Sequence, residues 1–128
     1  PVNTDPQPIV TIISETQAVL PMIGFIFLAV VIAPLNEELV FRAGVYRFFK
    51  DKAPRWAALG ASGVLFALLH ANLAGFAPLL FLGVALALIY EYSGSIRVAV
   101  AVHALFNANQ LVFIFLHQSG APIAPAPG

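Results

Sequence analysis

Five polar side chains with the chemistry to move protons or donate hydrogen bonds stand out in this mostly apolar chain: Glu37, Glu38, His70, His103 and Asn107. Hydrolysis of a peptide bond needs a base that takes a proton from water and donors that stabilise the developing oxyanion. Glu37 and His70 can hold and deprotonate the water. His103 and Asn107, one helical turn apart, can donate to the oxyanion. No serine or lysine is placed to act as a nucleophile. Ser62, Ser93 and Ser95 have no neighbouring base in the sequence, so a covalent mechanism is less favoured.

The two adjacent carboxylates differ in their local partners. Glu38 and Arg42 are four residues apart with the acid first, which favours an ion pair on one helix face. Glu37 lies about 100° around the helix, and the positions where a cation would pair with it hold Val40 and Phe41. Glu37 is therefore the carboxylate left to act as a general base. The alternative interpretation places both carboxylates at the membrane surface, as an ordinary helix end.

A stripe of polar residues lies along one face of the last apolar segment of the chain. Four of its side chains fall within about 80° of one another on a helix: His103, Asn107, Gln110 and His117. Polar side chains can also hold transmembrane helices together by hydrogen bonds, so a purely structural role is the alternative to a catalytic one. His70, taken alone, is equally compatible with an ordinary position at the membrane interface.

The composition excludes several classes of protein. The 128 residues include six basic and six acidic side chains, 60% are apolar, and the mean hydropathy is +0.91. A soluble domain of this length would carry roughly 32 charged residues, and the high hydropathy excludes a disordered chain. The balanced charge offers no basic surface to nucleic acid, and the absence of cysteine excludes disulfides and thiolate metal sites. The class of protein that remains is a membrane protein, and the lipid bilayer is its expected partner.

Uncharged stretches divide the chain into about four membrane spans. Residues 16–36 carry no formal charge, and residues 56–90 form a second such stretch, too long for one crossing and interrupted by a turn at 72–78. Residues 98–116 provide the fourth span. We therefore predict an all-α, polytopic transmembrane helix bundle over residues 16–117, between an extended N-terminal tail at 1–15 and a Pro/Ala-rich tail at 118–128.

Basic residues indicate where the first helix leaves the membrane and on which side. Five of the six fall between Arg42 and Arg55, which places that loop on the cytoplasmic side. The first helix is expected to run past its apolar part to Phe49, where aromatic and basic residues mark the interface.

Three short motifs occur in order on these apolar segments. They read EExxxR at residues 37–42, FxxxH at 66–70 and HxxxN at 103–107. This order resembles the CPBP intramembrane endopeptidases, the family of CAAX prenyl proteases of the Ras-converting type and of bacterial bacteriocin-processing and immunity proteins. The resemblance runs from residue 34 to residue 107.

The resemblance implies a multi-pass protease of the bacterial cytoplasmic membrane, with its catalytic side chains facing a cavity inside the bundle. Its substrate would be a membrane-associated peptide or a lipidated protein, and nucleic acid is not an expected partner. By motif position, Glu37 and His70 would activate the water. His103 and Asn107 would stabilise the oxyanion. The supporting members of the motifs would be Glu38, Arg42 and Phe66.

A metal ion and two other functions are alternatives to this interpretation. No cofactor is expected, but Glu37, His70 and His103 could also form a three-ligand zinc site with an open position, as in a metalloendopeptidase. The chain could instead be a non-catalytic membrane immunity or scaffold protein that binds a partner. A haem protein with His70 and His103 as axial ligands is the third possibility, although it leaves the EExxxR motif without a role.

Overall fold

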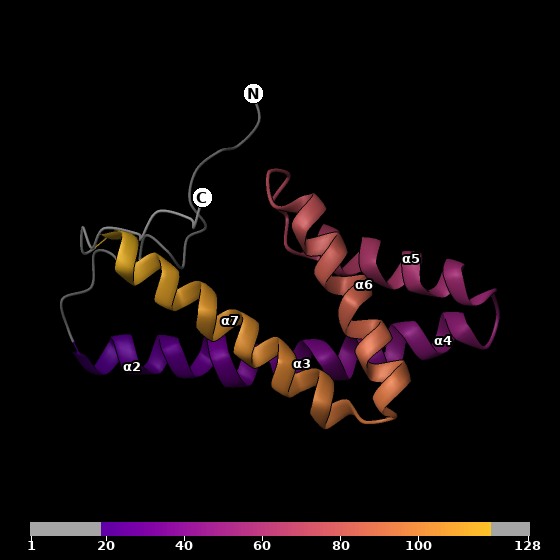
Figure 1. The fold of residues 1–128 in the computed structure, drawn as a ribbon, viewed down its shortest axis with the longest axis horizontal. Helices are drawn as coiled ribbons and strands as arrows, with labels where there is room; N and C mark the ends of the chain where they lie inside the picture. The colour runs from indigo at the N-terminus through magenta and orange to yellow at the C-terminus, as the bar shows by residue number, and fades with distance from the viewer. Residues whose placement is uncertain (1–18, 119–128) are drawn as a thin grey trace, which may run out of the picture.

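The computed structural model describes residues 19–118, which form a bundle of helices with no strand in that range (Figure 1). In chain order the elements, with η marking π-helical segments, are α2 (Val19–Phe27), η1 (Leu28–Ile32), α3 (Ala33–Glu38), η2 (Leu39–Tyr46), α4 (Arg47–Lys50), α5 (Arg55–Leu69), α6 (Phe76–Ser93) and α7 (Ile96–Gln118). The predicted all-α bundle is confirmed for these residues. The predicted tails at 1–15 and 118–128 lie outside the described residues, apart from Gln118 at the end of α7.

The first five elements join into one continuous helix, Val19–Lys50, of 32 residues, which runs along the bottom of Figure 1. The prediction that this helix continues past its apolar part to Phe49 is confirmed. Pro34 lies inside it, and a proline has no N–H with which to continue the hydrogen-bond series of an α-helix. The helix accommodates Pro34 with π-type hydrogen bonding in η1, where the Ala33 N–H donates to the Leu28 carbonyl, five residues back.

Three helical segments are long and apolar enough to cross a membrane: Val19–Lys50, Phe76–Ser93 and Ile96–Gln118. The remaining predicted span corresponds to α5, which has only 15 residues. Its length of about 22 Å falls short of a hydrocarbon core of about 30 Å. The helix is short because Pro54 precedes its first residue and because Ala71, with a φ of 49°, turns the chain away soon after its end. Residues 19–118 thus form three long apolar helices and one shorter one, which is compatible with the predicted bundle of about four spans.

Glycines allow α5 and α6 to pack closely along each other. A Cβ on Gly83 of α6 would lie 3.0 Å from the Cα of Gly63 on α5 and 3.2 Å from the side chain of Phe66. A Cβ on Gly63 would in turn lie 2.7 Å from a methyl group of Val84. Small residues of this kind let helix backbones approach in membranes, where van der Waals packing holds helices together.

Replacing Gly83 with Ala is expected to lower the free energy of unfolding by about 1–3 kcal/mol, because the added methyl group forces α5 and α6 apart. Gly60→Ala in α5 is the matched control, since a Cβ there meets nothing within 4 Å and alanine has the higher helix propensity. Thermal unfolding of the detergent-solubilised protein measures both changes. Equal stability of the Gly83→Ala and Gly60→Ala proteins would contradict the close crossing.

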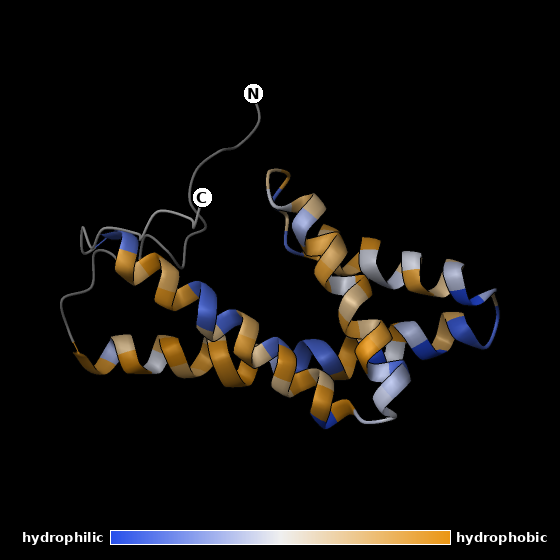
Figure 2. Ribbon diagram, in the orientation of Figure 1, coloured by the Kyte–Doolittle hydropathy of each residue, from blue (hydrophilic) through white to orange (hydrophobic). Residues whose placement is uncertain are grey.

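The helices are largely apolar, as the orange ribbon in Figure 2 shows, and many of their large apolar side chains are exposed. Leu20 on α2 is 80% exposed and Phe81 on α6 is 78% exposed. Large apolar side chains of this kind belong against lipid rather than water. The surface therefore agrees with an integral membrane protein.

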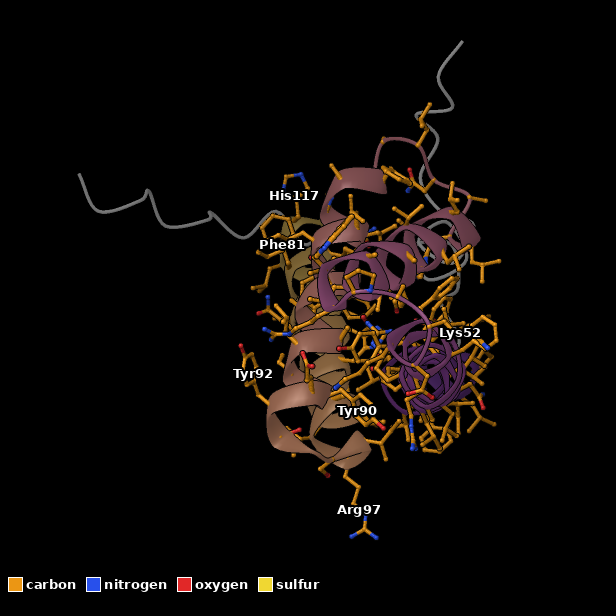
Figure 3. All side chains as sticks on the ribbon, turned by 90° about the vertical axis from the view of Figure 1, so that its right-hand side faces the viewer. Lys52, Phe81, Tyr90, Tyr92, Arg97 and His117 are labelled. Carbon is orange, nitrogen blue, oxygen red and sulfur yellow. The ribbon has the colours of Figure 1, made fainter. Side chains whose placement is uncertain are left out.

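Charged side chains gather where α4, the following turn and the end of α6 meet. Lys50 Nζ and Arg55 Nε each lie 2.8 Å from a carboxylate oxygen of Glu91. Arg55 Nη2 also donates a hydrogen bond to the hydroxyl oxygen of Tyr92, at 2.8 Å. Arg97, at the start of α7, points away from the bundle (Figure 3). The contacts of Lys50 and Arg55 with Glu91 hold the first helix, the start of α5 and the end of α6 together.

Arg42 does not belong to this polar end of the bundle. The prediction that grouped it with the basic loop is wrong, because its side chain is completely buried. Glu38, four residues earlier on the same helix, neutralises its charge and allows the guanidinium to lie inside the bundle. The four remaining basic residues of that region mark the polar end: Arg47, Lys50, Lys52 and Arg55.

Candidate active site

The motif residues come together where α7 crosses the middle of the first helix (Figure 1), and the side chain of His70 reaches Glu37 from the residue that follows α5. Each motif lies on a different element, so the site exists only after the bundle has folded. The first motif begins on α3 and ends on η2, the second lies at the end of α5, and the third lies on α7. All seven residues predicted for the site are within this region: Glu37, Glu38, Arg42, Phe66, His70, His103 and Asn107.

A buried ion pair forms the floor of the site. Arg42 Nε lies 3.0 Å from Glu38 Oε2, and both side chains are completely buried, which confirms the predicted ion pair. Arg42 Nη2 donates a second bond to the carbonyl oxygen of Gly83 on α6, at 2.9 Å. Its guanidinium carbon also lies 5.0 Å from the centre of the Phe66 ring. Arg42 therefore links the first helix to both α5 and α6.

The ion pair also positions His103. The second oxygen of Glu38, Oε1, lies 2.8 Å from His103 Nδ1. An ionised carboxylate only accepts hydrogen bonds, so Nδ1 of His103 carries a proton and donates it to Glu38 Oε1. The other ring nitrogen, Nε2, then faces the interior of the site. A carboxylate that fixes an imidazole in this way sets both its orientation and its tautomer.

His70 is oriented by a backbone group. Its Nδ1 lies 2.8 Å from the carbonyl oxygen of Phe66, and because a carbonyl only accepts, Nδ1 must be the donor. Its Nε2 therefore faces the same space as Nε2 of His103. The Phe66 ring packs against both imidazoles, with centroid distances of 4.7 Å to His70 and 5.8 Å to His103. Phe66 is completely buried and thus packs against both rings.

Glu37 faces both imidazoles. Its Oε2 atom lies 3.9 Å from His70 Nε2 and 3.6 Å from His103 Nε2. These separations are longer than direct hydrogen bonds, and no group in residues 19–118 donates a hydrogen bond to Oε2, which is itself buried. The three atoms converge, and because the Glu37 side chain is 29% exposed and lines the adjoining cavity, water can reach the Glu37 side chain.

Asn107 is anchored to the first helix. Its Nδ2 donates a hydrogen bond to the carbonyl oxygen of Ala29, at 2.9 Å. This carbonyl lies five residues before Pro34, which has no N–H to continue the π-type series of η1. The proline therefore leaves an acceptor that a side chain from α7 satisfies. One hydrogen of the Asn107 amide remains for another partner.

Replacing Asn107 with Ala is expected to lower the free energy of unfolding by about 1–3 kcal/mol, because the carbonyl of Ala29 is left unpaired in an apolar environment. Adding Pro34→Ala to that variant should restore part of the loss, since it supplies an N–H within the helix. Asn109→Ala on the same helix is the control, expected to change stability by less than about 0.5 kcal/mol. Thermal unfolding in detergent compares the three proteins, and an Asn107→Ala protein as stable as the control would refute the anchor.

A cavity of about 510 Å³ opens beside these residues. Its polar lining consists of Glu37, His70, Asn72, His103, Asn107 and Gln110. Its other walls are aliphatic or aromatic and include Leu79, Leu82, Phe106, Leu111 and Ile114. Ligand sites commonly combine an apolar wall of this kind with a few convergent polar groups. The cavity has the size and the chemistry to admit a peptide segment.

The predicted polar stripe on α7 is partly retained. Gln110 lines the cavity together with His103 and Asn107. His117 does not line it and instead stacks on Phe113, with a centroid distance of 6.2 Å and an interplanar angle of 11°. Asn72, in the turn after His70, was missed by the sequence analysis, because a residue in an Asn-Leu-Ala-Gly segment is typical of an ordinary turn.

The same side chains are the candidates for ligating a metal ion or a haem. Within residues 19–118, no group of three or more His, Asp or Glu side chains is arranged to hold a metal ion. The zinc alternative therefore gains no support from the described side chains. The haem alternative is disfavoured because Glu37 Oε2 lies 3.9 Å from His70 Nε2 and 3.6 Å from His103 Nε2, where an axially ligated macrocycle would have to lie.

The fold and the site together define an integral membrane helix bundle with a carboxylate and two imidazoles at its centre. The chain belongs to the type II CAAX prenyl endopeptidase Rce1-like family, whose model matches residues 19–109. This range contains every predicted site residue and confirms the resemblance drawn from the motifs. No solved structure matches the chain.

Two curated proteins of Lactococcus lactis subsp. lactis (strain IL1403) are similar to the chain. UPF0177 protein YaiH is 36% identical over 96 residues, which cover 72% of this chain and 38% of that protein. UPF0177 protein YbdI is 36% identical over 95 residues, which cover 73% of this chain and 51% of that protein. The chain therefore spans between about two fifths and a half of the length of these relatives.

Proposed function

We propose that the chain is an intramembrane endopeptidase that hydrolyses a peptide bond of a membrane-associated or lipidated protein. Membership of the Rce1-like family supports a CAAX-type membrane protease at the level of the family. The observation that carries the proposal for this chain is the convergence of Glu37 Oε2 with two imidazole Nε2 atoms beside an open cavity. The same arrangement favours hydrolysis by an activated water over a covalent mechanism.

In the proposed reaction Glu37 is the general base and later the general acid. The water donates one hydrogen bond to His70 Nε2 and loses its other proton to Glu37. Its oxygen forms a bond to the scissile carbonyl carbon, and the electron pair of the C=O bond moves to the carbonyl oxygen. Collapse of the tetrahedral intermediate breaks the C–N bond, and Glu37 returns its proton to the leaving amine.

The oxyanion is stabilised from the α7 side of the cavity. The free amide hydrogen of Asn107 is one donor, because the other hydrogen is fixed on Ala29. His103 is the second donor when Nε2 carries a proton, and the Glu38 carboxylate at Nδ1 stabilises the positive charge of that ring. Donors fixed in advance in a cavity with apolar walls are more effective than the same groups in water.

The apolar walls of the cavity indicate the class of substrate. A soluble peptide would gain little from aliphatic surroundings, whereas a hydrophobic or lipidated segment can bury apolar area there. The proposed partners are accordingly the bilayer and a peptide or lipidated protein, in the cytoplasmic membrane of a bacterium. No metal ion or other cofactor has a step in this mechanism.

Reconstituted protein tests the proposal. Liposomes that contain the chain are incubated with a library of synthetic membrane-associated peptides, prenylated and unmodified, and the products are identified by mass spectrometry. We expect cleavage at defined bonds, at a rate unchanged by a metal chelator. The absence of cleavage of every peptide, with stable peptide binding, would favour the non-catalytic immunity or scaffold function. Loss of cleavage on chelation, restored by zinc, would refute the metal-free mechanism.

A further inference from the structure

The cavity wall contains a carboxamide, Asn72, that the proposed mechanism does not use. Asn72 lies in the turn between α5 and α6, two residues after His70, and lines the same cavity as the catalytic centre. Its Oδ1 accepts a hydrogen bond from the N–H of Gly75, at 2.9 Å. This bond fixes which end of the amide is oxygen, so the position of the Nδ2 donor is defined as well.

The turn is built closely around this side chain. A Cβ on Gly75 would lie 3.3 Å from both Cγ and Nδ2 of Asn72, so glycine leaves the amide the space that it occupies. On the other side, Ala71 has a φ of 49°, a left-handed conformation that alanine rarely adopts. Strained residues of this kind persist where the surrounding structure holds them, and they often lie at binding sites.

The Nδ2 group has no acceptor among residues 19–118. The single hydrogen bond of the Asn72 side chain is the one through Oδ1, and the side chain is only half buried, so its N–H groups remain accessible. Other polar side chains of the cavity have hydrogen-bond partners within the bundle. His70 and His103 are bonded through Nδ1, and Asn107 donates to the carbonyl of Ala29. Asn72 is therefore an oriented donor at the cavity wall with no partner in the described part of the chain.

A peptide inside an apolar cavity brings main-chain carbonyl groups that need donors. Each such group left unpaired in a lipid-like environment is strongly unfavourable, so a bound peptide requires donors from the cavity wall. We infer that Asn72 Nδ2 binds a main-chain carbonyl of the substrate close to the scissile bond, and so positions that bond against Glu37 and His70. The inference rests on the proposed endopeptidase function and adds a substrate-binding residue to it.

The test uses the best-cleaved peptide of the membrane-associated library and the variant Asn72→Asp. Aspartate keeps an oxygen for the Gly75 N–H, so the turn is retained, but it has no N–H with which to bind the peptide. We expect KM to rise about 10-fold with kcat changed less than about two-fold, as for the loss of one hydrogen bond in binding. Asn109→Asp on α7, which does not line the cavity, is the matched control.

A scan of the peptide itself separates binding from a structural effect. Each main-chain amide near the scissile bond is replaced in turn by an ester, whose carbonyl is a weaker acceptor. One position should raise KM for the wild-type protein but not for Asn72→Asp, because the bond to Asn72 is already absent there. An unchanged KM in Asn72→Asp would overturn the inference. It would also be overturned if every ester substitution raised KM by the same factor in the wild-type protein and in Asn72→Asp.

Failure of the proposed function gives a different result. If the wild-type protein cleaves no peptide, or if cleavage is the same in a Glu37→Gln protein, the endopeptidase assignment fails. The test is then the affinity of a fluorescently labelled membrane-associated peptide for proteoliposomes, compared between the wild-type protein and Asn72→Asp. About 10-fold weaker binding by Asn72→Asp would still support the contact, and equal affinity would overturn it.

Discussion

Replacing Glu37 with Gln is expected to reduce the rate of peptide cleavage by about 10²–10⁴-fold, the contribution typical of a positioned general base. Glutamine has the same shape as glutamate but cannot take a proton from water. Among residues 19–118 no group donates a hydrogen bond to Glu37 Oε2, and the Glu37 side chain is 29% exposed. The fold therefore has little to lose when its charge is removed.

The measurement is kcat for the best-cleaved membrane peptide, together with the unfolding temperature of each protein in detergent. Asp51→Asn is the matched control, because Asp51 is an exposed acid at the polar end of the bundle, away from the cavity. We expect both variants to unfold at the wild-type temperature and only Glu37→Gln to lose activity. Full activity in Glu37→Gln would exclude Glu37 as the base and, with it, the proposed mechanism.

The parts of this site that depend on local spacing could be predicted from the sequence. The Glu38–Arg42 ion pair follows from four residues of separation on a helix, and it is present. The availability of Glu37 follows from the apolar residues at the positions where a cation would pair with it. The order of the three motifs then placed the chain in its family. Each of these features is read within one helical turn or along the chain, without knowledge of packing.

The parts that depend on how helices cross could not be predicted. Spacing does not show that His70 and His103 direct their Nε2 atoms to the same carboxylate oxygen, because α5 and α7 meet only in the folded bundle. The role of Gly83 as the carbonyl partner of Arg42 depends on the close crossing with α5. Arg42 was likewise misplaced in a basic loop, since a charge count along the chain cannot show burial.

Pro34 is an intermediate case. The sequence indicates that a proline inside a helix leaves a carbonyl group without its usual donor. It does not indicate which side chain will satisfy that group. The structure supplies Asn107, from a helix that lies more than 70 residues further along the chain. The local rule indicates that some carbonyl near Pro34 lacks its usual donor, and only the tertiary structure shows that this carbonyl belongs to Ala29 and that Asn107 is its donor.

Replacing Arg42 with Met is expected to destabilise the protein by about 3–5 kcal/mol, because it leaves the Glu38 carboxylate buried without its cation. The loss also removes the bond to the Gly83 carbonyl and the contact with Phe66. Unfolding in detergent measures the change. Arg97→Met is the control, since Arg97 is exposed and points away from the bundle (Figure 3), and it should differ from wild type by less than about 0.5 kcal/mol.

The double variant Glu38→Gln with Arg42→Met separates the structural role of the ion pair from its role at His103. Removing both charges should recover much of the stability lost by Arg42→Met alone, because buried ion pairs can often be exchanged for neutral groups of similar volume. Glutamine can still accept the bond from His103 Nδ1, so the ring keeps its orientation. It cannot stabilise a positive ring, however, and cleavage should remain about 10²–10⁴-fold below wild type. A double variant that is both stable and fully active would mean that Glu38 serves the fold alone. A stable protein without activity would show that the buried charge of Glu38 acts on the reaction through His103.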